Sequence, residues 1–177
     1  MKNRFHKGFT IIEVSLVIAV AGLIFLMVFV ALPGLRTSQR DSQRREDIAK
    51  FLEEVKNYQT NNRGALPGGS DPDSLDGVTN TSSGNTTITK WAGFYKEYLG
   101  DKFIDPDGKP YRLRIRTCNS SATECGNLDN ATFPNNYTML VVKQAQCDGT
   151  KAKPTGNPRK LAVIYKLEGA GAYCSNS

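Results

Sequence analysis

The chain contains one histidine, His6, among its 177 residues, and no recognisable catalytic constellation. It has no glycine-rich loop of the kind that cradles phosphate, and no nucleophile stands in a pattern with a base. Histidine is the side chain most often used for proton transfer near neutral pH. We therefore do not expect an enzyme, and no cofactor is indicated.

Acidic side chains are absent from the first eight residues, which carry Lys2, Arg4 and Lys7. The formal net charge of the whole chain is +6. Without residues 1–8, 20 basic side chains face 17 acidic ones, which leaves a side-chain charge of +3. A charge this small does not indicate a surface dedicated to nucleic acid.

Charge is also scarce in residues 9–32, where Glu13 is the only charged side chain. At 1.5 Å per residue, a helix of this length spans about 36 Å, enough to cross a bilayer. The basic residues before it predict a cytoplasmic N-terminus, with the rest of the chain outside. A cleavable secretory signal has a shorter apolar core. A plain signal anchor would explain the length and the basic flank, but not Glu13.

Glu13 is an unusual residue for a membrane-spanning segment, because an acidic side chain at the bilayer centre costs about 2.5–3.5 kcal/mol. A cut after Gly8 would create a cation four residues before it, the free amine of Phe9. In a staggered bundle of helices, Glu13 of one chain would neutralise the Phe9 amine of another and set the axial register. The alternative is that Glu13 lies at headgroup depth, against water or lipid.

Residues 7–13 read Lys-Gly-Phe-Thr-Ile-Ile-Glu, and this run resembles the class III signal of type IV prepilins and pseudopilins. The resemblance implies that a prepilin peptidase cuts between Gly8 and Phe9, so that residues 1–8 are a removed leader. It also implies N-methylation of Phe9 and extraction from the cytoplasmic membrane by an assembly platform with its ATPase complex. The helices then form a homopolymer, an extracellular pilus.

The helical pattern continues beyond the apolar segment as an amphipathic half over residues 33–62. Its apolar stripe recurs at three- and four-residue spacing and consists of Ile48, Phe51, Leu52, Val55 and Tyr58. Asn61, Asn62, Gly64 and Pro67 provide a stop signal. We predict one helix over about residues 9–62, and we interpret the charged run from Arg36 to Asp47 as a solvated face.

Three residues weaken this helix locally: Gly22, Pro33 and Gly34. In a helix interior, proline costs about 3 kcal/mol and glycine about 1 kcal/mol relative to alanine. In related pilins, the segment between such breakers melts on assembly, although the family's usual proline lies nearer the cleavage site than Pro33. Close helix packing at Gly22 and a simple kink at Pro33 are the alternatives.

Residues 63–177 are predicted to form a globular head. Residues 64–90 are rich in Gly, Ser, Thr, Asn and Asp and predict a long exposed loop, whereas residues 90–100 predict a short helix with core aromatics. Strands are predicted over residues 111–117, 137–143 and 160–167, and an antiparallel meander is the simplest topology. The fold class is therefore α+β and pilin-like, with one long N-terminal helix packed on a small antiparallel sheet.

All four cysteines lie in the C-terminal third of the chain. An even number behind a membrane-targeting start predicts disulfides formed outside the cytoplasm. The spacings of 7, 22 and 27 residues differ from the close pairs of a zinc ribbon. Three connectivities are open. The meander favours Cys118–Cys125 in one connection and Cys147–Cys174 at the opposite end, if the chain after residue 167 returns along the sheet.

Residues 105–111 read Asp-Pro-Asp-Gly-Lys-Pro-Tyr and resemble a turn of the major pseudopilins of type II secretion, some of which bind calcium nearby. Asp105 and Asp107 are weak calcium candidates, since two carboxylates are too few for a site. Three arginines alternate along residues 111–117, which offers a weak case for DNA or an acidic partner. The solvated side of a sheet is the simpler interpretation.

These observations lead to the hypothesis of a structural type IV pilus subunit, serving adhesion, twitching motility or DNA uptake. The head would meet a surface or host-cell ligand that the sequence does not identify. A pseudopilin of a type II secretion or competence machine is the alternative within the resemblance. A monomeric, membrane-anchored binding protein is the alternative from another class, and it predicts an intact N-terminus at Met1.

Overall fold

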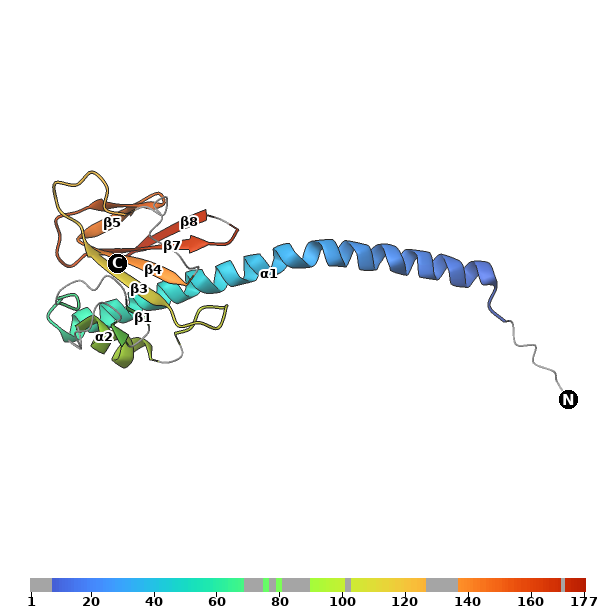
Figure 1. Ribbon diagram of the computed structural model, residues 1–177, viewed down its shortest axis with the longest axis horizontal. Coiled ribbons are helices and arrows are strands. Elements are labelled where there is room, and N and C mark those ends of the chain that lie inside the picture. Colours follow the sequence, from blue (N-terminus) through green and yellow to red (C-terminus); the bar gives the residue numbers. More distant parts are fainter. Residues whose placement is uncertain are drawn as a thin grey trace. The chain divides into compact units, whose positions relative to one another are not determined.

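The computed structural model describes residues 8–68, 75–76, 79–80, 90–100, 103–126, 137–169 and 171–177. The proposed leader, apart from Gly8, and most of the loop predicted over residues 64–90 lie outside these ranges. The chain divides into two units, Met1–Gln39 and Arg40–Ser177. Helix α1 (Ile11–Asn61) contributes its first part to one unit and its second part to the other (Figure 1).

Helix α1 confirms the single long helix expected from the sequence, with 51 residues. Pro33 lies inside it, and the helix continues on both sides of this residue. The helix ends in a Schellman-type turn, in which the Gly64 amide donates a 2.7 Å hydrogen bond to the Gln59 carbonyl. Gly64 has a φ of 81°, a conformation that glycine adopts without strain.

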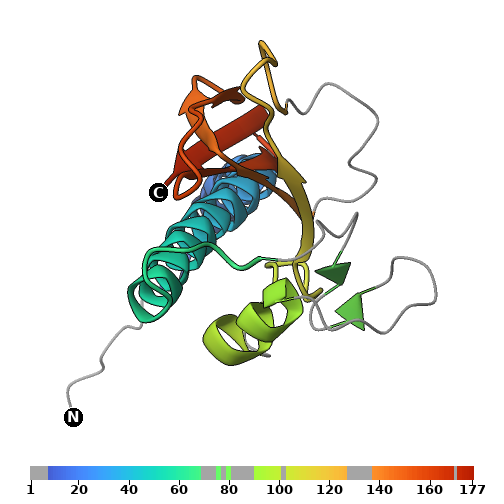
Figure 2. The same ribbon diagram turned by 90° about the vertical axis from the view of Figure 1, so that its left-hand side faces the viewer.

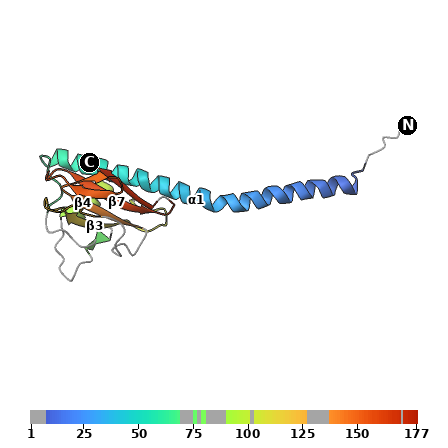
Figure 3. The ribbon, with the colours of Figure 1, turned by 90° about the horizontal axis from the view of Figure 1, so that it is seen from above.

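The head contains a six-stranded sheet in the order β2-β1-β3-β4-β7-β8 and a separate pair, β5–β6 (Figures 1 and 3). The three strands predicted from the sequence are present as β3, β4 and β7. The strands are β1 (Leu75–Asp76), β2 (Thr79–Asn80), β3 (Arg112–Thr117), β4 (Thr138–Lys143), β5 (Ala145–Asp148), β6 (Lys151–Pro154), β7 (Leu161–Leu167) and β8 (Gly171–Asn176).

The strand directions correct the predicted meander. Strand β3 pairs in parallel with β4, with Leu113 opposite Met139, whereas β4–β7 and β7–β8 are antiparallel. The sheet is therefore mixed. Parallel neighbours need a crossover connection and cannot be joined by a tight turn, and 20 residues separate the end of β3 from the start of β4. The α+β class, with a long helix against a small sheet, is confirmed.

The expectation of an irregular loop over residues 64–90 is wrong where β1 and β2 lie. Strand β1 pairs antiparallel with β3, with Leu75 opposite Leu113, and β2 pairs with β1. Strands of two residues are too short to produce a periodic pattern in the sequence. One edge of the sheet is therefore formed by β1 and β2, whose residues composition alone assigns to a loop.

One face of the sheet packs against the second part of α1 and against α2 (Lys90–Phe94) and the following π-helix η1 (Tyr95–Leu99). Figure 2 shows this yellow-green segment near the yellow β3. The predicted core role of the aromatic cluster is confirmed, since Trp91, Phe94 and Tyr95 are buried. Most of the apolar stripe of α1 is fully buried in the same core, and Tyr58 packs at its margin.

The other face of the sheet packs under β5–β6 and the two disulfides. The pairs are Cys118–Cys125 and Cys147–Cys174, with Cα–Cα distances of 5.3 and 5.8 Å. These are the pairings favoured from the sequence, although part of the reasoning was wrong. Because β3 and β4 are parallel, their C-terminal ends lie side by side. Cys118 and Cys147 therefore both come after the same end of the sheet, and not at opposite ends as expected. The expected return after residue 167 is β8, which carries Cys174.

Candidate functional site

The first part of α1 leaves its apolar side chains exposed on every side. Between Gly8 and Arg36, every residue except Ala21 is exposed, including Phe9 at 83% and Phe29 at 72%. This segment is long and apolar enough to cross a membrane. An exposed apolar surface of this size is compatible with a membrane, or with other apolar helices, around it.

The start of α1 is built by a feature that the sequence analysis missed. Thr10 precedes the helix, and its hydroxyl accepts a 3.3 Å hydrogen bond from the Glu13 amide. Threonine followed three residues later by glutamate is the spacing of a capping box, and an acidic residue in the first turn complements the helix dipole. Glu13 therefore stabilises the helix start whatever else it does.

The Glu13 carboxylate has no ion-pair partner within the part of the chain that the structure describes. Gly8 and Phe9, the residues on either side of the proposed cut, are exposed and precede the helix. The space around Gly22 and Gly34 is open, with no atom within 4 Å of a Cβ placed there. The structure thus places Gly8 and Phe9 in accessible chain before the helix, and Glu13, Gly22 and Gly34 on the exposed first part of the helix itself.

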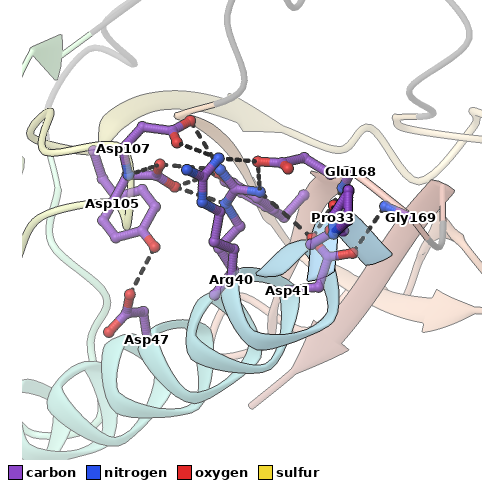
Figure 4. Close-up of polar contacts among 12 residues, drawn as sticks. Pro33, Arg40, Asp41, Asp47, Asp105, Asp107, Glu168 and Gly169 are labelled. Carbon is purple, nitrogen blue, oxygen red and sulfur yellow. Dashed lines mark hydrogen bonds and ion pairs between the residues drawn. The ribbon is translucent and has the colours of Figure 1, made fainter. Parts of the chain in front are cut away.

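The second polar feature is a cluster around Arg44, one of the buried residues of the head. Figure 4 labels the acidic residues that surround it, Asp41, Asp105, Asp107 and Glu168. All five N–H donors of its guanidinium point at acceptors. Nε and one terminal nitrogen bind the two oxygens of Asp105 at 2.9 and 3.1 Å. The remaining three bonds reach Asp107 at 3.1 Å, Glu168 at 2.6 Å and Asp41 at 3.4 Å. This is a fully satisfied buried arginine.

Asp105 is the buried acid of this cluster, with 2% exposure. Besides Arg44, it accepts a 2.8 Å hydrogen bond from the Tyr165 hydroxyl and a 2.9 Å bond from the Asp107 amide. Burial favours its neutral form, but hydrogen bonds from Arg44, the Asp107 amide and Tyr165 outweigh this, so the pKa of Asp105 is lowered. The pKa of the Tyr165 phenol is raised. Burial is the largest cause, and the negative charge of Asp105 adds to it.

Asp41 and Arg40 extend the cluster to the turn between β7 and β8. The Asp41 carboxylate accepts 2.9 Å hydrogen bonds from the amides of Glu168 and Gly169. Arg40 is half-exposed and lies 3.1 Å from Asp107 and 3.8 Å from Glu168. Two consecutive residues of α1 therefore hold separate loops of the head.

The interpretation of the charged run as a solvated face is wrong for Asp41 and Arg44, which are 6% and 0% exposed. A signal for their burial was present in the sequence. Both continue the apolar stripe toward the N-terminus, at three- and four-residue steps before Ile48. Charged residues at stripe positions predict burial with partners, because an unpaired charge cannot be accommodated there.

The weak calcium candidates, Asp105 and Asp107, direct their carboxylates at arginines instead. Within the described ranges, no group of three or more His, Cys, Asp or Glu side chains fits a metal ion. Nearby, the Tyr111 hydroxyl donates a 2.7 Å hydrogen bond to Asp47. Burial raises the pKa of Asp47, and the bond from Tyr111 opposes it. These contacts fix α1 to the turn that carries Asp105 and Asp107 and to Tyr111 beside β3.

The predicted alternation of β3 is present, since Leu113 and Ile115 are buried. Of its three arginines, Arg116 is exposed, whereas Arg112 and Arg114 are half-buried. Comparison of the chain with protein-family models, curated proteins and solved structures gives no match. What the protein does is therefore inferred from its own residues.

Proposed function

We propose that this chain is a type IV pilin-like subunit that polymerises through the first part of α1 into an extracellular filament. The observation that carries the proposal is the exposed apolar surface of this segment, interrupted by one charge, Glu13. A membrane covers such a surface before assembly, and a bundle of like helices covers it afterwards. The disulfide-bonded head is consistent with an oxidising location outside the cytoplasm.

The residues around Gly8 support processing before assembly. The run from Lys7 to Glu13 resembles a prepilin signal, and both Gly8 and Phe9 are exposed. Cleavage between them by a prepilin peptidase releases the basic leader, and N-methylation then modifies the Phe9 amine. The assembly platform and its ATPase complex are the further partners that this proposal requires.

Glu13 supplies the register of the proposed filament. Its carboxylate has no partner among the described residues of its own chain, and an unpaired acid in an apolar core is unfavourable. The methylated amine of Phe9 on a neighbouring chain is a cation at the matching end of its helix. Each helix is therefore held at the axial position where this pair forms.

The test of this pairing is Glu13→Ala, compared with Glu53→Ala as the matched control. Glu53 is an exposed acid on the same helix, beyond the apolar segment. We expect the first variant to be cleaved and membrane-inserted but to yield little surface filament, whereas the control assembles normally. Normal assembly of Glu13→Ala would remove the pairing role from the proposal.

Mass spectrometry of material sheared from the cell surface tests the proposal as a whole. The expected species begins at N-methylated Phe9 and carries two intact disulfides. A chain recovered only from membranes, and starting at Met1, would contradict polymerisation. That result would favour the monomeric, membrane-anchored binding protein.

A pseudopilin of a type II secretion or competence machine is the second candidate, and the turn at residues 105–111 favours it. Asp105 and Asp107 in this turn hold Arg44, so the turn fixes the helix to the head. A pseudopilin would be cut after Gly8 but retained in the cell envelope. Shearing of cells at ordinary expression levels therefore separates the two candidates, because it releases a surface pilus but not a retained pseudopilin. Adhesion, twitching motility or DNA uptake would follow only from a surface filament.

A further inference from the structure

Two adjoining hollows lie where α1 ends against the turn before β7. They measure about 570 and 410 Å³ and share Arg63, Gly64 and Arg159 in their walls. Lys56 and Lys160 complete the charged lining of the larger one. We call four of the lining cations, Lys56, Arg63, Arg159 and Lys160, the basic groove. Lys143 is a fifth cation, in the wall of the smaller hollow, and no Asp or Glu occurs among the described residues that line either hollow.

Some cations of the described part of the head are paired: Arg44, Lys151 and Lys153 each form an ion pair with an acid. Others, such as Arg45, Lys50 and Lys166, have no ion pair among the described residues, so the groove is set apart by the gathering of its cations. Among the described residues, the side chains of Arg63 and Arg159 form none, whereas Lys160 donates a 2.8 Å hydrogen bond to the main-chain oxygen of Ser177, the last residue of the sequence, which also lines the larger hollow. Two guanidinium groups without an acidic side chain beside them create a positive potential that attracts anions.

The position of Arg159 is fixed by its surroundings. A Cβ placed on Gly64 would lie 3.1 Å from the guanidinium carbon, so glycine leaves the room that this side chain occupies. The side-chain amide of Gln59 donates a 2.8 Å hydrogen bond to the Arg159 carbonyl, and the side-chain oxygen of Asn157 accepts a 2.9 Å bond from the backbone amide of Arg159. The guanidinium is therefore presented from a turn tied to the end of α1.

The backbone at the groove is in an unfavourable conformation at two positions. Within the described ranges, the non-glycine residues with positive φ are Arg63 at 56° and Gln144 at 59°, and both line the smaller hollow. Arg63 occupies the helix-end position that usually carries glycine. Backbone in sparsely populated regions is found often at functional sites. Arg63 therefore places a cation where glycine would fit with less strain.

We infer that the basic groove binds the phosphate groups of a polyanionic ligand. Two guanidinium groups offer paired donors that match the oxygens of a phosphate, and two ammonium groups add charge. No aromatic side chain occurs among the described lining residues, so bases or sugar rings have no stacking platform. The ligand is held through its charges. This inference concerns the single subunit and does not depend on filament assembly.

The test measures binding to the full chain in an uncharged detergent at low salt by titration calorimetry. The probes are sodium tripolyphosphate and, in a second arm, a short DNA duplex. The variants are Arg63→Gly and Arg159→Gln, and Lys166→Gln is the control because Lys166 is an exposed cation outside the groove. Each groove variant should weaken tripolyphosphate binding about tenfold to a hundredfold, whereas the control leaves it unchanged.

The variant Arg63→Gly also separates binding from structure. Glycine suits the positive φ at this position, so its melting temperature should stay the same or rise while affinity falls. Binding of tripolyphosphate alone identifies a small phosphate ligand. Binding of both probes, with a salt slope reduced by about 1 in each variant, identifies a phosphodiester chain.

Absence of binding to either probe overturns the inference, as does binding that both groove variants leave intact. Neither result bears on filament assembly, which the Glu13→Ala experiment tests independently.

Discussion

Replacing Arg44 with methionine should destabilise the head by about 3 kcal/mol, the lower end of the range for breaking a buried ion pair. Both partners of the central pair, Arg44 and Asp105, have side chains with 0% exposure, so water does not weaken their attraction. Methionine fills part of the volume but supplies none of the five donors. Asp105 is then left charged and buried.

The contacts that remain in Arg44→Met explain why the expected loss of stability lies at the lower end of this range. Asp105 keeps two of its donors, the Tyr165 hydroxyl and the Asp107 amide. Asp107 and Glu168 have side chains that are 32% and 22% exposed, so water can replace the lost bonds to Arg44. A loss of about 3 kcal/mol is a large part of the 5–15 kcal/mol that typically holds a domain together.

The assay is urea unfolding of the full chain in detergent, followed by the fluorescence of its only tryptophan, Trp91, which is buried in the head. Arg40→Met is the matched control, since Arg40 lies one turn away and contacts two of the same acids. Its side chain is 47% exposed, and the expected cost is about 0.2–1 kcal/mol. The double variant Arg44→Met/Asp105→Asn should recover at least about 1 kcal/mol, because it removes the stranded charge.

Equal costs for Arg44→Met and Arg40→Met would refute the reasoning, since burial would then make no difference. A double variant no more stable than Arg44→Met would also refute it, because the penalty would not come from Asp105.

Three further changes test other parts of the head. The folded-state pKa of Asp105 is lowered, so its contribution is fully present above about pH 4 and is lost as the pH falls through that folded pKa; Asp105→Asn should flatten acid unfolding there, and an unchanged pH profile would exclude this group. Replacing Cys147 and Cys174 by serine opens a cross-link with a sequence separation of 27 and should cost about 3.6 kcal/mol in urea unfolding; no loss would mean that strand pairing alone fixes β8. Gly126→Ala places a Cβ 2.7 Å from Leu140 Cδ2 and should lower stability by about 1–3 kcal/mol, measured as a lower melting temperature; an unchanged value would show that the leucine moves aside.

Patterns local in sequence predicted much of the fold. The stripe beginning at Ile48 gave the buried face of α1, and alternation gave β3, β4 and β7 with errors of one residue at their starts. Helical and strand periodicity depends on neighbouring residues, so it is visible without knowledge of the fold. The direction of β4 relative to β3 depends instead on the path of the connection between them, and no periodicity reports that path.

The Arg44 cluster could not be assembled from the sequence for a related reason. Arg44 lies 61 residues before Asp105 and 124 before Glu168, and these distant acids are what allow an arginine to be buried. Without knowledge of such partners, a charged run is reasonably interpreted as solvated. The burial signal was the position of Asp41 and Arg44 on the apolar stripe. The basic groove was equally hidden, because only the folded head brings Arg159 next to the end of α1.

The contacts of α1 with the head have a mechanical consequence. A pull applied to the N-terminal part of this helix travels along the chain and enters the head at Arg40, Asp41 and Arg44. These residues are bonded to two loops at once, the turn that holds Asp105 and the turn between β7 and β8. The load is therefore divided among several parallel bonds, and the Cys147–Cys174 cross-link further secures β8 beyond the second turn.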